Sequence, residues 1–319
     1  MEIISNPTQG DINMAANALK DGHLVAFPTE TVYGLGADAT NEKSVSRIYS
    51  VKGRPINHPL IVHISSINQL DKWAIEIPEC AIKLAAEFWP GPMTLILKRN
   101  KIARDFITGG QDSIALRVPD HPVTLKLLNI FESLGGEGLA APSANRFGAL
   151  SPTNSNEVNL EIGEHLGAND LILNGGQCLV GIESTIINCT EHTPKILRPG
   201  AITELMIERS ISTKIKTELN SQSIRTSGAF KSHYSPIAQV VLDSSPNPGE
   251  GFLALKNFPT PPGSIRLASP ISLEEFANVL YSALRLADIK GIRKISVIAP
   301  EGSGLAAAIR DRLNKASGL

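Results

Sequence analysis

The chain of 319 residues carries a net charge of −1 and is 42% hydrophobic, so it is long and apolar enough for one large or two ordinary domains. Because the net charge is close to zero, the protein as a whole does not attract nucleic acid. Nucleic acid could then bind only at a local basic groove. No apolar run could span a bilayer, and the first residues lack the pattern of a signal peptide. Cys80, Cys178 and Cys189 are widely spaced, which indicates free thiols in a reducing compartment rather than disulfides or a zinc site. We therefore expect a cytoplasmic protein without a membrane segment.

The first part of the chain predicts helices and strands around two polar loops. The expected elements are a helix at 11–20, a strand at 23–27, a loop at 28–36, a helix from Thr40 or Asn41, a loop at 52–59 and a strand at 60–64. The first loop, PTETVYGLG, is rich in hydroxyl groups and glycine and contains Thr31. We expect Gly34, Gly36 and Gly53 to admit a ligand close to the backbone or to adopt positive φ.

The second loop places two cations, Lys52 and Arg54, on either side of Gly53, and Pro55 stiffens the turn. Such a pair beside exposed N–H groups suits a polyphosphate, whereas the alternative is a solvated turn with two ordinary cations. The neighbouring hydroxyl-rich loop favours the phosphate. His63 lies in the strand that follows. A histidine there is more often structural than a ligand, and we keep it as a candidate because it comes just after the cationic loop.

The middle of the chain predicts a further alternation of helices and strands. Helices are expected at 67–73, 79–88 and 123–132, and strands at 93–97, 112–118 and 171–173. Arg117 lies near the end of the second of these strands. The sequence leaves open whether it is the partner of a nearby carboxylate or a clamp for an anion.

Two stretches of small and polar residues provide further candidates. GLAAPSANRFGALSP, at 138–152, presents Ser143, Asn145 and Ser151, whose short polar side chains suit a nucleotide; an ordinary turn is the alternative. GIESTI places Glu183 and Ser184 before another strand. Glu183 could bind a metal or pair with an arginine, and we favour the ion pair.

The last third divides into a linker and a small unit. Residues 210–237 are dense in Ser, Thr, Lys and Asn, which predicts a linker, and Tyr234 lies in the segment FKSHYSP near its end. Strands at 238–242, 251–255, 264–267 and 294–298, with helices at 273–289 and 305–316, predict a small α/β domain. We therefore expect a first domain at 1–209, a linker at 210–237 and a second domain at 238–319.

Five motifs in this order, PTETVYGLG, KGRP with HPLIVHI, APSAN, GIESTI and LRPG, resemble the YrdC-type L-threonylcarbamoyl-AMP synthases over about residues 12–200. The HYSP segment and the C-terminal unit resemble the long, two-domain form of that family. The resemblance implies an α/β fold, with a twisted, open, mixed sheet and flanking helices around a concave cavity, followed by a smaller Rossmann-like α/β domain. It also implies the reaction of L-threonine, bicarbonate or CO2, and ATP to threonylcarbamoyl-AMP and pyrophosphate, the first step of t6A modification of tRNA.

The resemblance also implies a role for each candidate residue. Lys52 and Arg54 match the catalytic cations that contact ATP. The remaining positions that match nucleotide contacts are His58, Ser143, Asn145, Ser151, Arg198 and Tyr234. The positions that match threonine contacts are Thr31, His63, Arg117 and Ser184. Mg²⁺ is expected to accompany ATP through the phosphates and water, without protein ligands, and the segment around Tyr234 is expected to fold over the cavity.

Other functions and partners stay open at this stage. This fold class could bind double-stranded RNA through a basic concave face, against which the near-neutral charge argues. A related domain acts on carbamoyl phosphate, but in proteins with zinc-binding CxxC pairs that this chain lacks. By resemblance, the product passes to the t6A threonylcarbamoyl transferase machinery, and any contact with tRNA itself is weak.

Overall fold

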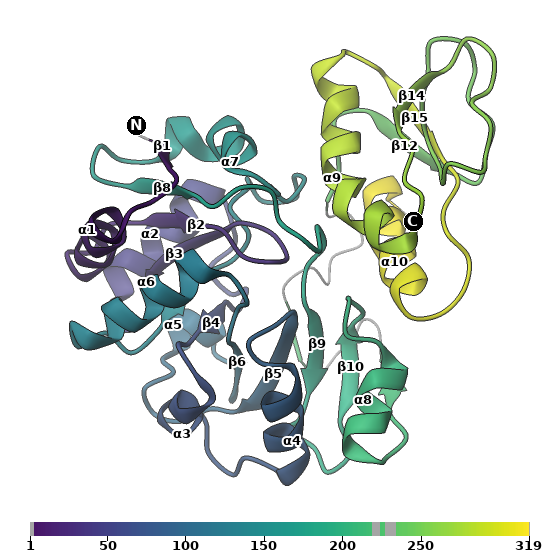
Figure 1. Ribbon diagram of the computed structural model, residues 1–319. Coiled ribbons are helices and arrows are strands. Elements are labelled where there is room, and N and C mark those ends of the chain that lie inside the picture. Colours follow the sequence, from purple (N-terminus) through teal and green to yellow (C-terminus); the bar gives the residue numbers. More distant parts are fainter. Residues whose placement is uncertain (1–2, 219–223, 227–233, 319) are drawn as a thin grey trace.

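The computed structural model describes residues 3–218, 224–226 and 234–318 and confirms an α/β fold with a large twisted mixed sheet and a second, smaller sheet (Figure 1). The strands of the large sheet are β1 (Ile3–Ser5), β2 (Val25–Phe27), β3 (Gly34–Asp38), β4 (Ile61–His63), β5 (Met93–Lys98), β6 (Ser113–Arg117), β7 (Leu139–Ala140), β8 (Leu171–Asn174), β9 (Thr185–Asn188), β10 (Lys195–Arg198) and β11 (Lys216–Thr217). Among the described residues their order across the sheet is β1-β8-β2-β3-β7-β4-β6-β5-β9-β10-β11.

Helices flank this sheet and bury apolar faces against it. They are α1 (Gln9–Lys20), α2 (Glu42–Lys52), α3 (Leu70–Trp73), α4 (Glu79–Phe88), α5 (Asp105–Thr108), α6 (Pro122–Ser133), α7 (Ser155–Ile162) and α8 (Glu204–Ile211), with single 3-10 turns at Ile67–Gln69 and Gly163–His165. α1 shows why the local sequence folds as it does. Thr8 and Asp11 form a capping box at its start, and Ile12 and Leu19 lie on its buried face.

The centre of the sheet brings four chain segments side by side. β4 pairs with β6 in parallel, and the register places His63 directly opposite Arg117. β6 is antiparallel to β5, which in turn runs parallel to β9 with Met93 opposite Thr185. Polar residues at these strand ends therefore meet at one edge of the sheet, although they are far apart in the sequence.

Two expectations about the polar loops are corrected by the structure. β3 starts at Gly34, so Gly34 and Gly36 lie in a strand without positive φ and not in a loop. Their lack of a side chain makes room for Phe27, because a Cβ at Gly36 would lie 2.6 Å from the ring. Lys52 is the last residue of α2, and Gly53 (φ 63°) ends that helix in the left-handed conformation, as a glycine at this place favours.

The C-terminal unit has its own sheet and two helices. Its strands are β12 (Gln239–Leu242), β13 (Gly251–Leu253), β14 (Ile265–Ala268) and β15 (Lys294–Val297), in the order β12-β15-β13-β14, and they pair in parallel. α9 (Leu273–Ile289) and α10 (Leu305–Ser317) pack on this sheet on the side of the first domain (Figure 1). The sequence predicted these elements almost to the residue.

The two units share one hydrophobic cluster. Phe276, Leu280 and Tyr281 of α9 belong to the same buried cluster as Val32 and Ile182, which lie in two of the five motifs. β11 lies inside the stretch that was expected to be a linker, and it pairs with β10 of the first unit. Part of that linker, including the HYSP histidine at 233, lies outside the described residues, and the boundaries at 209 and 237 stay a prediction.

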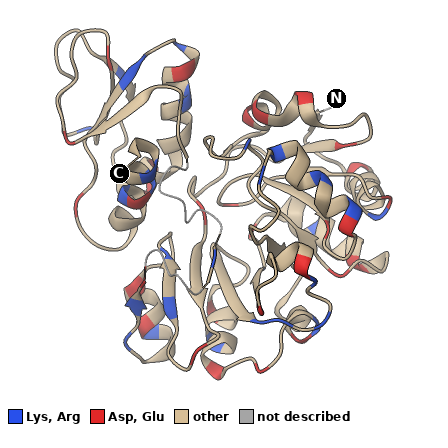
Figure 2. Cartoon of the chain, turned by 180° about the vertical axis from the view of Figure 1, so that it is seen from behind, with Lys and Arg blue, Asp and Glu red and all other residues tan. Residues whose placement is uncertain are grey.

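The surface of the molecule carries both signs of charge. Figure 2 shows Lys and Arg interspersed with Asp and Glu along the helices, as the net charge of −1 leads one to expect. None of the described helices is long and apolar enough to cross a membrane.

Candidate functional site

A small cavity at the centre of the large sheet gathers most of the predicted site residues. Its free volume is about 50 Å³, and its wall includes Thr31, Arg54, His63, Arg117, Ser143, Ser184, Arg198 and Tyr234. Pockets for small molecules usually measure about 300–1,000 Å³. In the described conformation the cavity is therefore closed to a ligand of that size, because side chains fill the space.

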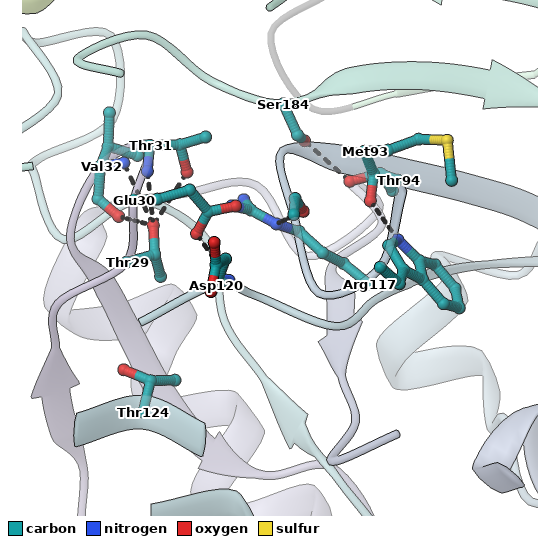
Figure 3. A network of polar contacts seen from close by, with 12 residues as sticks. Thr29, Glu30, Thr31, Val32, Met93, Thr94, Arg117, Asp120, Thr124 and Ser184 are labelled. Atoms are coloured by element: carbon teal, nitrogen blue, oxygen red, sulfur yellow. Dashed lines mark hydrogen bonds and ion pairs between the residues drawn. The ribbon is translucent and has the colours of Figure 1, made fainter. Parts of the chain in front are cut away.

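Arg117 is held at the cavity by a carboxylate that sequence reasoning did not select. Its guanidinium donates to Glu30 over 2.6 Å, and both side chains are only 5% exposed. Nε of Arg117 also donates to the carbonyl of Gly91, and the backbone N–H of Asp120 donates to Glu30 (Figure 3). Arg117 thus pairs with a carboxylate, one of the two possibilities that the sequence left open, and it also lines the cavity, so its role as a clamp for an anion stays a prediction.

His63 is a neutral side chain beside this cation. Burial, then the charge of Arg117, lowers the pKa of His63 to about 3. Its Nδ1 has no hydrogen-bond partner within the described part of the chain, although the ring is almost fully buried. A neutral ring nitrogen at a cavity wall is suited to an uncharged hydrogen-bonding group, such as a hydroxyl.

Hydroxyl groups border the cavity on both sides of Arg117. Thr31 lies 2.8 Å from the hydroxyl of Thr29, and Ser184 lies 2.7 Å from the hydroxyl of Thr94 (Figure 3). Arg198 adds a second tie to Ser184, because its guanidinium donates to the Ser184 hydroxyl at 3.1 Å and to the Ser184 carbonyl at 3.0 Å. These bonds fix the orientation of the short side chains at the wall.

The two predicted catalytic cations occupy different places. Arg54 lines the cavity, donates to the carbonyl of Pro59, and stacks over Phe147. Lys52 is only 2% exposed, and its ammonium lies behind the wall, where it donates to the carbonyls of Ser143 and Asn145. Lys52 therefore faces the protein interior rather than the cavity in this conformation, since α2 carries its side chain there, and its contact with ATP stays a prediction.

Three further predicted nucleotide contacts also lie behind or beside the wall. Asn145 donates its amide to the carbonyls of Arg146 and Ala149, while its Oδ1 has no partner among the described residues. Ser151 is fully buried and donates to Glu183 at 2.6 Å. His58 is half-buried, and its ring packs edge-on against Phe147.

Tyr234 is the described residue of the HYSP segment that reaches the cavity. It is 1% exposed and adopts φ of 60°, a conformation that a non-glycine residue rarely takes. Its ring lies 5.6 Å from that of Tyr281 and 5.6 Å from the guanidinium carbon of Arg312. Tyr234, near the end of the expected linker, thus packs between the cavity and the C-terminal unit.

Glu183 connects the cavity wall to the C-terminal unit through an ion pair, as the sequence favoured. Its carboxylate accepts hydrogen bonds from Ser151, Tyr281 and Arg312, at 2.6, 2.9 and 2.8 Å. Burial alone would raise the pKa of Glu183, but the charges of Arg312 and Arg198 and these hydrogen bonds lower it to about 2. Glu183 is therefore a carboxylate throughout the ordinary pH range.

The carboxylates at the wall do not fit a protein cage for a cation. Glu183 and Glu30 already accept hydrogen bonds from an arginine and from other donors, which leaves little of either charge for a metal. Within the described ranges, no group of three or more His, Cys, Asp or Glu side chains is placed to hold a metal ion.

Comparisons with known proteins identify the family. A model described as Sua5_yciO_yrdC, telomere recombination, matches residues 17–200, and a model described as threonylcarbamoyl-AMP synthase, C-terminal domain, matches residues 202–318. The chain belongs to the Sua5/YciO/YrdC family, in its two-domain form. The resemblance read from the five motifs is thereby confirmed.

Several relatives show this family likeness over nearly the whole of both chains. A threonylcarbamoyl-AMP synthase from Pyrococcus abyssi is 40% identical over 96% of this chain and 94% of its own length. A second, from Bacillus subtilis, is 37% identical over 99% of this chain and 95% of its own. The crystal structure of Pyrococcus abyssi Sua5 complexed with L-threonine matches with a TM-score of 0.89 and 36% identity, covering 100% of this chain and 98% of that one.

Proposed function

We propose that the protein is an L-threonylcarbamoyl-AMP synthase, which joins L-threonine, bicarbonate or CO2, and ATP and releases pyrophosphate. Whole-length similarity to two threonylcarbamoyl-AMP synthases carries this proposal. The cavity supports it independently, because eight of the twelve residues selected from the motifs lie in one wall. Its polar groups match an amino acid with a carboxylate and a hydroxyl.

Threonine is proposed to bind between β3, β4, β6 and the start of β9. Arg117 is the cation at this wall that Glu30 holds in place, so its remaining donors suit the threonine carboxylate. The neutral His63 and the hydroxyls of Thr31 and Ser184 are suited to the amine and hydroxyl of the ligand. The description of the related Pyrococcus abyssi structure, complexed with L-threonine, supports this assignment.

ATP is proposed to lie against Arg54, Ser143 and Arg198, whose two guanidinium groups can offset phosphate charge. Lys52 then acts indirectly, because its ammonium donates to the carbonyls of Ser143 and Asn145 and so holds this part of the cavity wall in position. Direct contact of Lys52 with a phosphate would require the ammonium to leave these carbonyls. His58, Asn145 and Ser151 stay proposed nucleotide contacts that need the closed wall to open.

The reaction needs no protein nucleophile. The threonine amine attacks the carbon of CO2 to give a carbamate and a proton, and a carbamate oxygen then attacks the α-phosphorus of ATP. The bond from that phosphorus to the bridging oxygen breaks, and pyrophosphate leaves. The protein contributes orientation of the reactants and neutralisation of charge, which makes it a nucleotidyltransferase by this proposal. Mg²⁺ held by the phosphates and water stays a prediction, and no step here relies on it.

Tyr234 is proposed to cover the bound reactants. ATP is larger than the free volume of about 50 Å³, so its entry requires side chains of the wall to move, and Tyr234 is the one proposed here. Its strained φ and its place between two units fit a residue that has more than one position. If Tyr234 covers the cavity in this way, the threonylcarbamoyl-adenylate would stay bound until it is transferred.

The cellular setting is proposed on the same basis. The product would serve the threonylcarbamoyl transferase machinery of t6A synthesis in the cytoplasm, with at most weak contact to tRNA by this protein. The proposed domains are the synthase unit at 1–209 and the C-terminal unit at 238–319, joined by 210–237. The near-neutral net charge disfavours the alternative of an RNA-binding module, which needs a basic face.

Pyrophosphate release from ATP by the purified protein tests the proposal, with each of the twenty amino acids in turn and with or without bicarbonate. We expect release only when L-threonine and bicarbonate are both present. Release without either one would contradict the synthase assignment and direct attention to the RNA-binding alternative.

A further inference from the structure

An arginine from the C-terminal unit lies at the back of the cavity wall. Arg312 stands on α10 between Ile309 and Leu313, on the face that this helix buries. Its side chain is 0% exposed. A charged group in such a place is expensive unless each of its donors has a partner, so its contacts indicate why it is there.

The contacts of Arg312 join two separate segments of the synthase unit. Nε donates to the carboxylate of Glu183 at 2.8 Å, and Nη2 donates to the carbonyls of Glu183 at 3.3 Å and Pro199 at 3.0 Å. Nη1 donates to Asp311, its neighbour on the helix, at 2.7 Å. The planar guanidinium therefore ties Glu183, two residues before β9, to Pro199, the residue after β10.

Both tied residues adjoin side chains of the cavity wall. Glu183 precedes Ser184, and Pro199 follows Arg198, the residue whose guanidinium holds the Ser184 hydroxyl. Tyr281, also from the C-terminal unit, donates to the same carboxylate as Arg312. The positions of Ser184 and Arg198 thus depend on a cation that another unit of the chain supplies.

A second interdomain arginine provides a contrast. Arg285 of α9 is 5% exposed, and it pairs with Glu161 and donates to the carbonyl of Leu150. It joins the same two units, yet none of these partners lines the cavity. A variant of Arg285 can therefore weaken the contact between the two units without removing the hydrogen bonds of Arg312 to Glu183 and Pro199.

We propose that Arg312 is a positioning residue for the threonine subsite, acting through Glu183 and Pro199 on Ser184 and Arg198. The C-terminal unit then contributes to substrate affinity by fixing the wall from behind. This inference rests on the proposed synthase function, because it takes Ser184 as a threonine contact.

The test compares L-threonine binding, measured by calorimetry without ATP, and the steady-state KM and kcat of pyrophosphate release. The variants are Arg312→Lys, Arg312→Met and the double variant Glu183→Gln/Arg312→Met. The double variant also replaces the buried carboxylate of Glu183, so this group is not left without the cation that pairs with it. Two control variants are Arg285→Met at the interface and Arg310→Met on α10. Among the described residues, Arg310 donates its hydrogen bonds to Asp243, Ala299 and Pro300 of the C-terminal unit. Thermal unfolding of every variant is measured alongside.

We expect Arg312→Met to bind L-threonine about tenfold more weakly or worse and to raise the KM for threonine in proportion, with kcat less affected. The double variant should regain thermal stability but not affinity, and Arg312→Lys should be intermediate because an ammonium lacks the planar fork that reaches Glu183 and Pro199 at once. The two controls should bind threonine as the unchanged protein does.

Unchanged threonine affinity in the double variant and in Arg312→Lys would overturn the proposal, even if Arg312→Met itself fails to fold. A fall in kcat with KM unchanged, which a smaller folded fraction produces, would also overturn it, as would an equal loss of affinity in Arg285→Met. Failure of the unchanged protein to bind L-threonine would instead refute the proposed function.

Discussion

Replacement of Arg117 by lysine tests the threonine subsite, because it retains the charge and removes the planar fork. The guanidinium reaches Glu30 over 2.6 Å and the Gly91 carbonyl over 3.3 Å while it also lines the cavity. An ammonium presents its three donors from one point and lacks the planar fork, so it meets Glu30 and a ligand carboxylate together less well than the guanidinium does. One charge-assisted hydrogen bond is worth about 1.5–3 kcal/mol, which corresponds to about tenfold to a hundredfold in affinity.

Calorimetric titration of Arg117→Lys with L-threonine should therefore show binding weaker by about tenfold to a hundredfold, with the KM for ATP little changed. Arg99→Lys is a matched control, because Arg99 pairs with Asp105 near the surface, away from the cavity wall. Arg117→Ala is a poorer test, since removing one partner of a buried pair costs about 3–5 kcal/mol of stability. Unaltered threonine affinity in Arg117→Lys, or an equal loss for ATP, would refute this reasoning.

Three further outcomes are expected. Lys52→Ala should lower thermal stability as well as ATP binding, since it removes the donor behind Ser143; activity lost at full stability would show that the ammonium acts on ATP directly. Tyr234→Ala should release the adenylate faster in a single-turnover assay, and an unaltered release rate would remove the covering role. The thiol of Cys80 should react with iodoacetamide half-maximally near pH 6, because its hydrogen bond with Cys189 and backbone N–H groups lower its pKa to about 6 against burial. A lowered pKa means that the reactive thiolate forms above this pH, so a half-maximum at about 8.5 in labelling followed by peptide mass spectrometry would be contrary to expectation.

Much of the fold could be predicted because its local signals agree with its tertiary structure. α9 coincides with the helix expected at 273–289, since its apolar residues recur at helical spacing over a long stretch. Short elements were less predictable. β3 was assigned to a loop because Gly34 and Gly36 are poor strand formers by propensity, whereas packing against Phe27 selects them.

The site could be predicted where a motif residue points into the cavity, and less well where it supports another residue. Arg117 and His63 were selected and lie opposite each other on paired strands. Glu30 was not selected although it lies in the first motif, because nothing in the sequence shows that it faces Arg117, which is 87 positions further along the chain. Thr94 lies within an apolar strand and carries no signal of its own.

Contacts between the two units were beyond sequence reasoning. Arg312 lies in a predicted helix, and one signal was available, namely a charged residue on the apolar face between Ile309 and Leu313. That signal indicates a buried ion pair but not its partner. The partner Glu183 became evident only when the two domains were placed together.

The measurement that tests the central claim most directly is mass spectrometry of the product formed from ATP, L-threonine and ¹³C-labelled bicarbonate. The account predicts threonylcarbamoyl-AMP that carries one labelled carbon, together with pyrophosphate, and no product when threonine is omitted. An unlabelled threonyl-AMP, or AMP without an adduct, would contradict it, because the protein would then activate threonine directly or only hydrolyse ATP.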